Sequence, residues 1–238
     1  MAENIEGLLL SSANALGVRL MPAQTDAFQR YLNLLISWNK KMNLTAITEP
    51  RDICIKHFAD SLTVLDTVTL KPRAKVLDVG SGAGFPGLPM KIARDDLQLT
   101  IIDSQQKRLT FLEEVLKKIN LTAELLHGRA EDLGREKKLR VKFDLVTARA
   151  VAPLNLLCEY CMPFVKMGGA FVAMKGPDVT EELSQAQNAI QTLGCELAEE
   201  KKLSLLDGSG RTLLVFKRTK GFSMEYPRPG TKIAKKPL

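Results

Sequence analysis

The chain has 238 residues, of which 45% are hydrophobic and 26% are charged, and its formal net charge is +7. This composition excludes a disordered chain and is typical of a globular protein with one sizeable core. The N-terminal stretch lacks a basic flank, and no apolar run reaches the roughly 18 residues that a membrane span needs, so we expect a cytoplasmic protein with no membrane segment.

Cysteine usage argues against a disulfide framework or a zinc site. The chain has four cysteines, and Cys158 and Cys161 form a CxxC motif, but no second pair follows. The run over residues 154–160 has a helical pattern. We therefore expect these two cysteines to be core thiols, and we expect no metal.

Residues 1–70 have helical periodicity. After a proline suited to a first helical turn, apolar side chains recur every three to four residues at Phe28, Tyr31, Leu32, Leu35, Ile36 and Trp38. We expect this stripe to pack within the chain, and hence a monomer. A second helix is expected over residues 51–66 and would place His57 on a packed line; the alternative is that His57 lines a substrate cleft.

Beyond residue 71, short apolar runs alternate with helical patterns. Five strand-then-helix units follow one another, and residues 195–218 predict two antiparallel strands around a turn. This order predicts an α/β fold, a mostly parallel seven-stranded sheet with helices on both faces and a C-terminal antiparallel hairpin. We expect a helical extension over residues 1–70, a core over residues 71–220 and a tail over residues 221–238.

The central motif is the run VLDVGSGAGFPG over residues 76–87. A strand that enters a glycine-rich loop and then a helix can hold a nucleotide cofactor, because Gly80, Gly82 and Gly84 leave the main chain bare. The run satisfies GxGxxG, so a nicotinamide or flavin cofactor is one interpretation. Asp78, the prolines that open the next helix and the C-terminal hairpin instead resemble the class I methyltransferases that use S-adenosylmethionine. In that class the methionine end of the cofactor lies across the glycine loop, which implies contacts at Gly80, Gly82 and Phe85.

Two further acids occur at the spacing of cofactor contacts. Asp103 closes a strand about 20 residues past the glycines, where an acid can accept hydrogen bonds from both ribose hydroxyls; the alternative is a helix cap. In class I methyltransferases an acid in a third element accepts from the adenine amino group. This resemblance implies Glu131 or Asp132, of which we favour Glu131, with a backbone contact from Ala130; otherwise these acids cap the next helix.

The end of the fourth strand, residues 147–153, should face the substrate, because the carboxyl ends of parallel strands line the ligand crevice. Many amino-methylating enzymes have a polar-Pro-Pro-aromatic motif here, and this chain lacks it. A nucleophile such as guanine N7 carries no proton before attack and needs alignment more than a general base. Arg149 could bind the guanine edge or the cofactor carboxylate; alternatively it pairs with Asp144 or is exposed.

The C-terminal segment is strongly basic. Residues 217–238 contain seven lysines and arginines and one acid, spaced among prolines and glycines, a composition that favours an extended chain. The charge predicts contact with the phosphates of a nucleic acid; the alternative is a solvated terminus that aids solubility.

Several short motifs occur in a specific order along the chain. They are Trp38-Asn39, NLTA at residues 43–46, HFADSL at 57–62, the glycine loop, ARAVAPL from residue 148, MKG at 174–176 and YPR at 226–228. With this order the chain resembles, almost end to end, the bacterial small-subunit ribosomal RNA guanine-N7 methyltransferases, formerly called glucose-inhibited division protein B. It departs from the family pattern after residue 228, where PGTKIAKK lacks a proline beyond the glycine.

The resemblance implies N7-methylation of one guanine in 16S rRNA, with S-adenosylmethionine as cofactor and 16S rRNA or the small ribosomal subunit as partner. It implies cofactor contacts at Gly80, Phe85, Ala130, Glu131 and Arg149. Candidate substrate-positioning residues are Arg149, Lys175 and His57, and candidate RNA contacts in the tail are Arg228, Lys232, Lys235 and Lys236. The alternatives are an NAD(P)-dependent oxidoreductase and a non-catalytic RNA-binding protein on the same fold.

Overall fold

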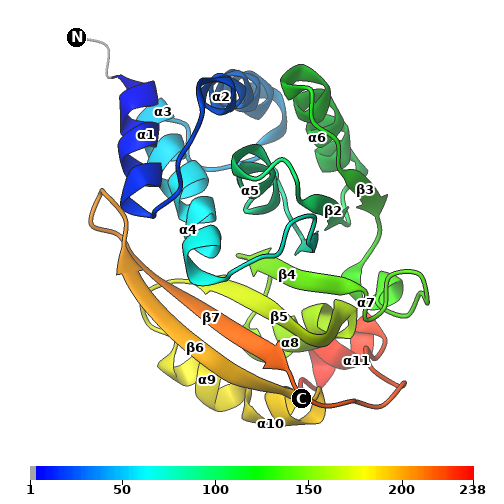
Figure 1. Ribbon diagram of the computed structural model, residues 1–238. Coiled ribbons are helices and arrows are strands. Elements are labelled where there is room, and N and C mark those ends of the chain that lie inside the picture. The colour runs from blue at the N-terminus through cyan, green and yellow to red at the C-terminus, as the bar shows by residue number, and fades with distance from the viewer. Residues whose placement is uncertain (1–3) are drawn as a thin grey trace.

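The computed structural model describes residues 4–238, and this part of the chain folds around a seven-stranded sheet. The strand order is β3-β2-β1-β4-β5-β7-β6, in which β1 to β5 are parallel and β7 is antiparallel to both of its neighbours. The strands are β1 (Lys75–Val79), β2 (Gln98–Asp103), β3 (Glu124–His127), β4 (Phe143–Arg149), β5 (Val165–Lys175), β6 (Cys195–Ser204) and β7 (Gly210–Arg218). The predicted mostly parallel sheet with its C-terminal antiparallel hairpin is therefore confirmed (Figure 1).

Helices cover both faces of the sheet, because successive strand residues point to opposite sides. Val76 and Leu145 join the core on one face, whereas their chain neighbours Leu77 and Val146 join the core on the other. The first face is covered by α1 (Ile5–Ala15), α2 (Pro22–Met42), α3 (Pro50–Ile53), η1 (Cys54–Ala59), α4 (Asp60–Thr67), α5 (Gly87–Ala93) and α6 (Gln106–Ile119). The second face is covered by α7 (Ala130–Leu133), α8 (Leu154–Cys161), η2 (Met162–Phe164), α9 (Thr180–Gln185), α10 (Gln187–Thr192) and α11 (Gly230–Lys235).

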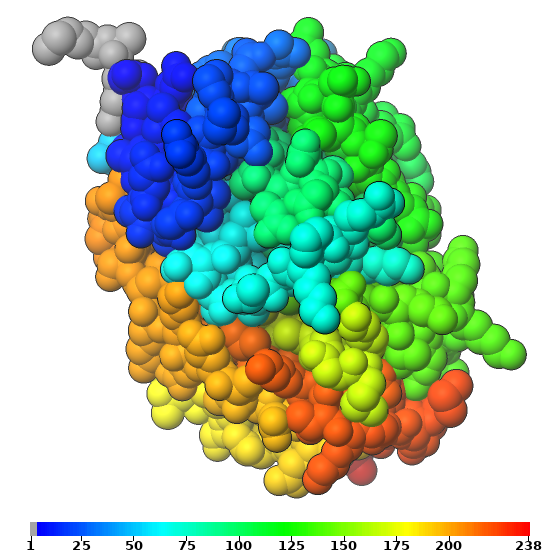
Figure 2. Space-filling model, in the orientation of Figure 1, coloured from blue at the N-terminus to red at the C-terminus, as the bar shows by residue number. Residues whose placement is uncertain are grey.

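The apolar stripe of α2 packs within the chain, as expected. Phe28, Tyr31 and Leu35 are at most 1% exposed. The Tyr31 hydroxyl donates to the carbonyl of Ala83 in the glycine loop, and its ring stacks on Phe85 with the two centroids 5.6 Å apart. The N-terminal helices are thereby tied to the loop, and Figure 2 shows them as one continuous body with the sheet region.

The helix expected over residues 51–66 is not regular. It is divided into α3, the π-helical segment η1 and α4. A π-helix closes its hydrogen bonds one residue later than an α-helix, and such turns occur frequently at functional sites. The expected uniform α-helical line through His57 is therefore wrong, although the Ser61 hydroxyl still donates to the His57 carbonyl at 2.5 Å.

The C-terminal segment folds back onto the core, contrary to the extended chain that its composition favoured. Residues Gly230–Lys235 form α11, which packs beside α8, and Ile233 is fully buried (Figure 1). The reason is a long-range ion pair between Arg228 and Glu159 of α8, which a local composition pattern does not reveal.

The cysteines behave as predicted. Cys158 and Cys161 are free thiols and fully buried, and burial raises the pKa of both.

Across residues 4–238, no helix is long and apolar enough to cross a membrane. The same residues contain no group of three or more histidines, cysteines or acids that could hold a metal ion.

Candidate functional site

The glycine loop after β1 is shaped by Asp78. This fully buried carboxylate accepts hydrogen bonds from Ser81 Oγ at 2.5 Å, the Gly87 amide at 2.9 Å and Thr147 Oγ1 at 3.0 Å. Burial raises the pKa of the Asp78 carboxyl, and the three donors act in the opposite direction. Asp78 therefore holds the two ends of the loop to β4, and its side chain does not face a ligand.

One side of the glycine loop is open. Gly80 and Gly82 have φ angles of +67° and +61°, a region that glycine adopts without strain. A Cβ added at Gly82 would meet nothing within 4 Å, and one added at Gly80 would lie 2.7 Å from a methyl group of Val151. Gly84 instead faces Tyr31, whose hydroxyl would lie 2.5 Å from an added Cβ. The main chain is therefore open to a ligand at Gly82, whereas Val151 covers Gly80. Gly84 allows protein packing, so the expected bare main chain at Gly84 is wrong.

Asp103 ends β2 directly beside this open side. It is 1% exposed, and its carboxylate accepts from the Gly82 amide at 3.0 Å, the Gln105 amide at 2.8 Å and Arg108 at 3.4 Å. A carboxylate offers about four lone-pair sites, so these three donors leave capacity for one ribose hydroxyl, and a second hydroxyl would replace the long contact with Arg108. The open main chain at Gly82 and the Asp103 carboxylate are the groups that could hold the methionine end and the ribose of S-adenosylmethionine.

Ala130 and Glu131 begin α7 at the same edge of the sheet. The Gly128 amide donates to the Asp103 carbonyl at 3.1 Å, which joins the ends of β2 and β3. Glu131 is 4% exposed, and its Oε1 accepts from Arg129 Nε at 2.6 Å. The structure thus brings together the two acids for which the sequence predicted ribose and adenine contacts.

Phe85 lies differently from the prediction. Its ring is 4% exposed and stacks on His57 with the centroids 4.4 Å apart, and the Arg149 guanidinium lies 5.0 Å from the ring centroid. The side chain therefore connects the loop to η1 and β4.

A cavity of about 460 Å³ lies beside the ends of β4 and β5. It is lined by Ile47, Lys56, His57, Asp60, Arg149, Ala150, Met174, Lys175, Gly176, Glu182 and Arg211. Its lining includes four cationic side chains but only two carboxylates. Lys56 also pairs with Asp52 at 3.3 Å and with Asp207 at 3.5 Å. The positive charge that suits an anionic ligand such as a nucleotide therefore comes from Arg149 and Arg211, which share one carboxylate.

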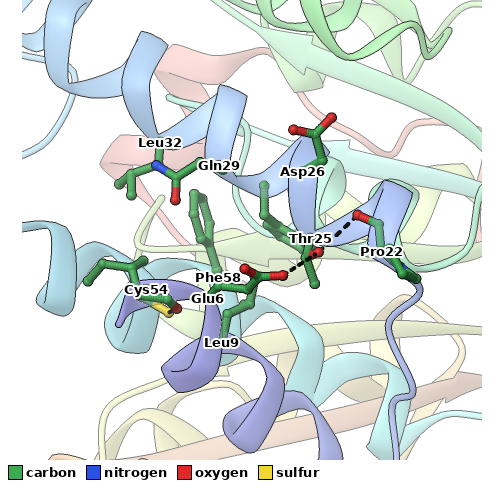
Figure 3. Close-up of a pocket in the computed structure, with 11 residues that line it drawn as sticks. Glu6, Leu9, Pro22, Thr25, Asp26, Gln29, Leu32, Cys54 and Phe58 are labelled. Carbon is green, nitrogen blue, oxygen red and sulfur yellow. Dashed lines mark hydrogen bonds between the residues drawn. The ribbon is translucent and has the colours of Figure 1, made fainter. Parts of the chain in front are cut away.

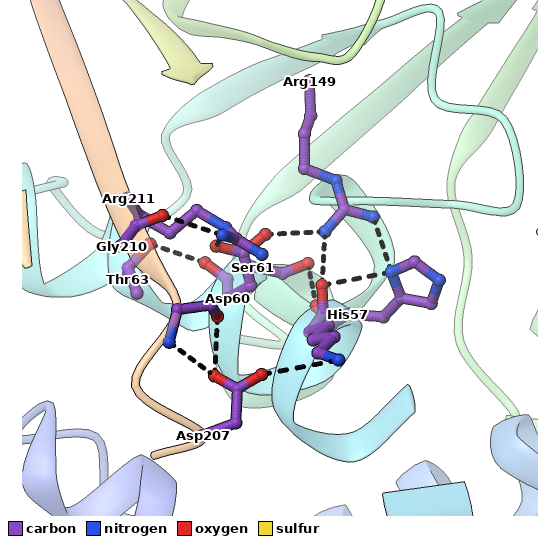
Figure 4. Close-up of polar contacts among 10 residues, drawn as sticks. His57, Asp60, Ser61, Thr63, Arg149, Asp207, Gly210 and Arg211 are labelled. Carbon is purple, nitrogen blue, oxygen red and sulfur yellow. Dashed lines mark hydrogen bonds and ion pairs between the residues drawn. The ribbon is translucent and has the colours of Figure 1, made fainter. Parts of the chain in front are cut away.

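Asp60 organises the cationic side of this cavity (Figure 4). It is 2% exposed and accepts from Arg149 Nη1 at 2.9 Å and from Arg211 Nε at 3.1 Å. Arg149 also donates to the Lys56 carbonyl at 3.1 Å. The alternative pairing of Arg149 with Asp144 is wrong, because Asp144 pairs with a lysine instead. One buried carboxylate thus fixes two arginines from β4 and β7.

His57 packs in the core, as the first alternative from the sequence expects, and it also lines the cavity. Its Nδ1 lies 3.1 Å from Arg149 Nη2, and its Nε2 lies 2.7 Å from Thr45 Oγ1. Burial, followed by the charge of Arg149, lowers the pKa of His57 to about 3. The imidazole is therefore neutral at physiological pH.

Lys175 reaches the loop that follows β4. Its ammonium donates to the Ala152 carbonyl at 2.9 Å and pairs with Glu182 at 2.6 Å, and the side chain is 12% exposed. Because Val151 of the same loop covers Gly80, Lys175 connects the cavity to the glycine loop.

The sequence did not single out Asp60, Arg211 or Lys56. Asp60 could have been found, because it is the acid of the HFADSL motif. Arg211 follows the hairpin turn and has no local motif. Its contact with Asp60 spans 151 positions in the chain.

The structure divides the predicted RNA contacts of the tail into two groups. Arg228 is 7% exposed, and its guanidinium is bound by both carboxylate oxygens of Glu159, so the prediction that it contacts RNA is corrected. Lys232, Lys235 and Lys236 are exposed on or next to α11.

A second cavity, of about 210 Å³, lies between α1, α2 and η1 (Figure 3). Its charged lining residues are the acids Glu6 and Asp26, and Glu6 accepts from the Thr25 hydroxyl at 3.2 Å. This acidic cavity does not suit a nucleic acid, so the cationic cavity is the better candidate.

Comparisons with known proteins agree with this geometry. A family model described as GidB, rRNA small subunit methyltransferase G, matches residues 24–208. Ribosomal RNA small subunit methyltransferase G of Desulforamulus reducens is 48% identical over 232 residues, covering 97% of each chain. The protein of the same name from Alkaliphilus oremlandii is 44% identical over 236 residues, covering 98% of this chain and 99% of its own.

Solved structures with little sequence similarity share the fold. The 16S rRNA (adenine(1408)-N(1))-methyltransferase from Catenulisporales acidiphilia has a TM-score of 0.53 at 13% identity, over 64% of this chain and 88% of its own. Precorrin-6y C5,15-methyltransferase from Geobacter metallireducens has a TM-score of 0.52 at 14% identity, over 67% of this chain and 87% of its own. At such identities the likeness concerns the fold alone.

Proposed function

The chain belongs to the rRNA small subunit methyltransferase G family, and from this premise we propose that it transfers a methyl group from S-adenosylmethionine to N7 of one guanine in 16S rRNA. Family membership replaces the oxidoreductase interpretation of the glycine loop. The observation that best supports an rRNA substrate is the cationic cavity. Ala150 of the loop after β4 lines this cavity, and Val151 of the same loop contacts Gly80 of the glycine loop.

The cofactor would be held at the carboxyl edge of β1, β2 and β3. Bound there, S-adenosylmethionine supplies an electrophilic methyl carbon on a sulfonium sulfur. The open main chain at Gly82 would face its methionine end, Gly80 would join this contact once Val151 moves aside, and Asp103 would accept from the ribose. The main chain of Ala130 and the carboxylate of Glu131 would face the adenine.

The target nucleotide would enter the cationic cavity. Enzymes that modify a base take it out of the stack, so the guanine must leave its neighbours. Arg149 is held by Asp60 and can donate to guanine O6, which leaves N7 free to attack. Lys175 and Arg211 would meet phosphate oxygens. The neutral His57 is not required as a base, because N7 carries no proton before attack.

Methyl transfer to defined substrates tests the proposal. We expect labelled methyl from S-adenosylmethionine to appear as 7-methylguanosine when either 30S particles or free 16S rRNA are supplied, and the two rates identify which form is the substrate. A label on another nucleoside would contradict the proposed nucleophile. RNA binding without any transfer would leave the non-catalytic RNA-binding alternative.

A further inference from the structure

The carboxylate of Glu131 packs against the C-terminal segment. A Cβ added at Gly230 would lie 2.1 Å from Glu131 Oε1 and 3.0 Å from Glu131 Cδ. A larger residue at this position would therefore force the carboxylate, the far end of a flexible side chain, to move. The other contact of Oε1 is with Arg129, whose side chain is 65% exposed and hence a weak constraint. Gly230 is the rigid neighbour that limits where the Glu131 carboxylate can lie.

Gly230 is held in place by the residues just before it. Arg228 donates its backbone amide to Glu159 Oε1 at 2.7 Å, and its Nη2 donates to Glu159 Oε2 at 2.6 Å. Glu159 is fully buried on α8. Since backbone and side chain of Arg228 bind the same carboxylate, the chain has little freedom two residues later, at the start of α11.

The same segment also contacts the far end of α7. Pro227 would lie 3.1 Å from a Cβ added at Gly134, the residue that follows α7. Arg140 donates to the Tyr226 carbonyl at 2.5 Å and to the Gly134 carbonyl at 3.3 Å. Residues 226–230 therefore contact α7 at both of its ends.

We propose that the C-terminal segment is part of the cofactor site, in which Gly230 and Arg228 are positioning residues that aim the Glu131 carboxylate at the adenine amino group. This inference rests on the proposed function, because it takes the adenine contact of Glu131 from there. In the described part of the chain Glu131 Oε2 receives no hydrogen bond, so this oxygen is available for the amino group. A tail that was expected only to contact RNA would thus also help select the nucleoside.

The test compares two ligands that differ at the 6-position of the base. S-adenosylhomocysteine presents an amino group, whereas S-inosylhomocysteine presents an oxo group that a carboxylate repels. A hydrogen bond to a charged acceptor corresponds to about a tenfold or greater preference, so we expect the wild-type protein to bind the adenosyl ligand at least about tenfold more tightly by isothermal titration calorimetry. In Gly230→Ala this preference should shrink at least fivefold, mainly through loss of adenosyl affinity.

Controls separate positioning from general damage. Gly221→Ala, in the same segment but with nothing within 4 Å of its added Cβ, should leave the preference unchanged. Glu131→Gln should reduce the preference, and adding Gly230→Ala to it should reduce the preference no further, because the two act through one interaction. Thermal unfolding by circular dichroism confirms that each variant is folded.

Three outcomes would overturn the inference. They are an unchanged preference in Gly230→Ala, an equal loss of affinity for both ligands, and a further drop of the preference when Gly230→Ala is added to Glu131→Gln. A wild-type protein that binds both ligands equally would remove the role of Glu131 and this inference with it. A protein that prefers the adenosyl ligand but methylates no rRNA would contradict the proposed function and leave the inference intact.

Discussion

Two buried carboxylates, Asp60 and Glu159, each bind arginine, but only one of them faces a cavity. Asp60 is shared by Arg149 and Arg211, whose side chains remain 15% and 23% exposed. Glu159 binds Arg228 alone, and the two side chains are 0% and 9% exposed. The first arrangement leaves positive charge at a surface that a ligand can reach. The second is neutral and closed, so the difference lies in the number of arginines that share each carboxylate and in how exposed these arginines are.

The comparison shows why basic residues in a sequence are poor guides to RNA contacts. Arg228 stands in the most basic stretch of the chain, yet both its charge and its hydrogen bonds are satisfied inside the protein. Arg211 lies outside the basic stretch over residues 217–238, yet it lines the cationic cavity. Burial and pairing decide which guanidinium is free to act on a ligand.

Removing Glu159 should have the largest effect. In Glu159→Ala the guanidinium of Arg228 stays buried without its counter-charge, and we expect the free energy of unfolding to fall by about 3–5 kcal/mol in urea titrations. Hydrogen exchange should become fast in residues 226–235, which this pair holds. The exposed Glu196 gives a matched control in Glu196→Ala. A loss below about 1 kcal/mol would show that the Arg228–Glu159 pair is not what holds the tail against the core.

Neutralising Asp60 should affect catalysis more than stability. In Asp60→Asn, Arg149 and Arg211 lose the charged acceptor that fixes both of them, and we expect kcat/KM for rRNA methylation to fall by about 10–100-fold. The affinity for S-adenosylmethionine should change less than about twofold, because Asp60 is bonded to no residue of the glycine loop. Asp66→Asn, which removes an exposed partner of Lys201, is the control.

If Asp60→Asn methylates rRNA at the wild-type rate, the orientation of the two arginines does not matter for the reaction. If it loses cofactor affinity as strongly as activity, the cavity belongs to the cofactor and not to the substrate.

His57 contacts Arg149, which binds Asp60, and it should make the free energy of unfolding depend on pH. The Arg228–Glu159 pair contains no histidine and should add no such dependence. Its pKa is lowered to about 3 in the folded protein from an ordinary 6.5, so the unfolded chain binds a proton first as the pH falls. Stability is therefore fully present above pH 6.5 and is lost as the pH falls towards 3. The loss is at most about 1.4 kcal/mol per pH unit, or roughly 1–2 kcal/mol between pH 7.5 and 5.5.

Urea unfolding at these two pH values measures the difference. His57→Gln should remove this part of the pH dependence, whereas a Gln substitution at the exposed His127 should retain it. Equal slopes in the wild type and His57→Gln would mean that His57 is not held neutral by burial and by Arg149.

The fold was predictable because its signals are local. Alternating apolar runs, the glycine loop and the hairpin turn each lie within a dozen residues, and all seven strands occur where these patterns place them. The position of Asp103 at the end of β2 was predictable for the same reason, since its distance from the glycines is set by one strand-helix-strand unit. The arginine clusters depend on contacts across 69 to 151 positions of the chain, and no periodicity encodes these. The π-helical turn at η1 likewise has no signature that distinguishes it from an α-helix.

The smallest expected effect concerns the exposed lysines that follow Arg228 in the tail. Lys232, Lys235 and Lys236 share the tail with Arg228 but have no buried partner in the described chain, so they are free to meet phosphates. Each phosphate contact contributes about 0.7–0.9 to the slope of log Kobs against log salt concentration. We therefore expect each single Lys→Ala change to weaken binding of 16S rRNA only a few-fold and to lower this slope by less than about 1.

Filter binding between low and moderate salt measures the slopes, and Lys117→Ala on α6, on the opposite side of the sheet from α11, is the control (Figure 1). The triple lysine variant should lower the slope by about 2–3. Its affinity for S-adenosylmethionine should be retained, because the Arg228–Glu159 pair and Gly230 are intact. An unchanged slope in the triple variant would mean that the three lysines do not contact rRNA and that rRNA binds elsewhere on the surface. The tail would then act only through the Arg228–Glu159 pair.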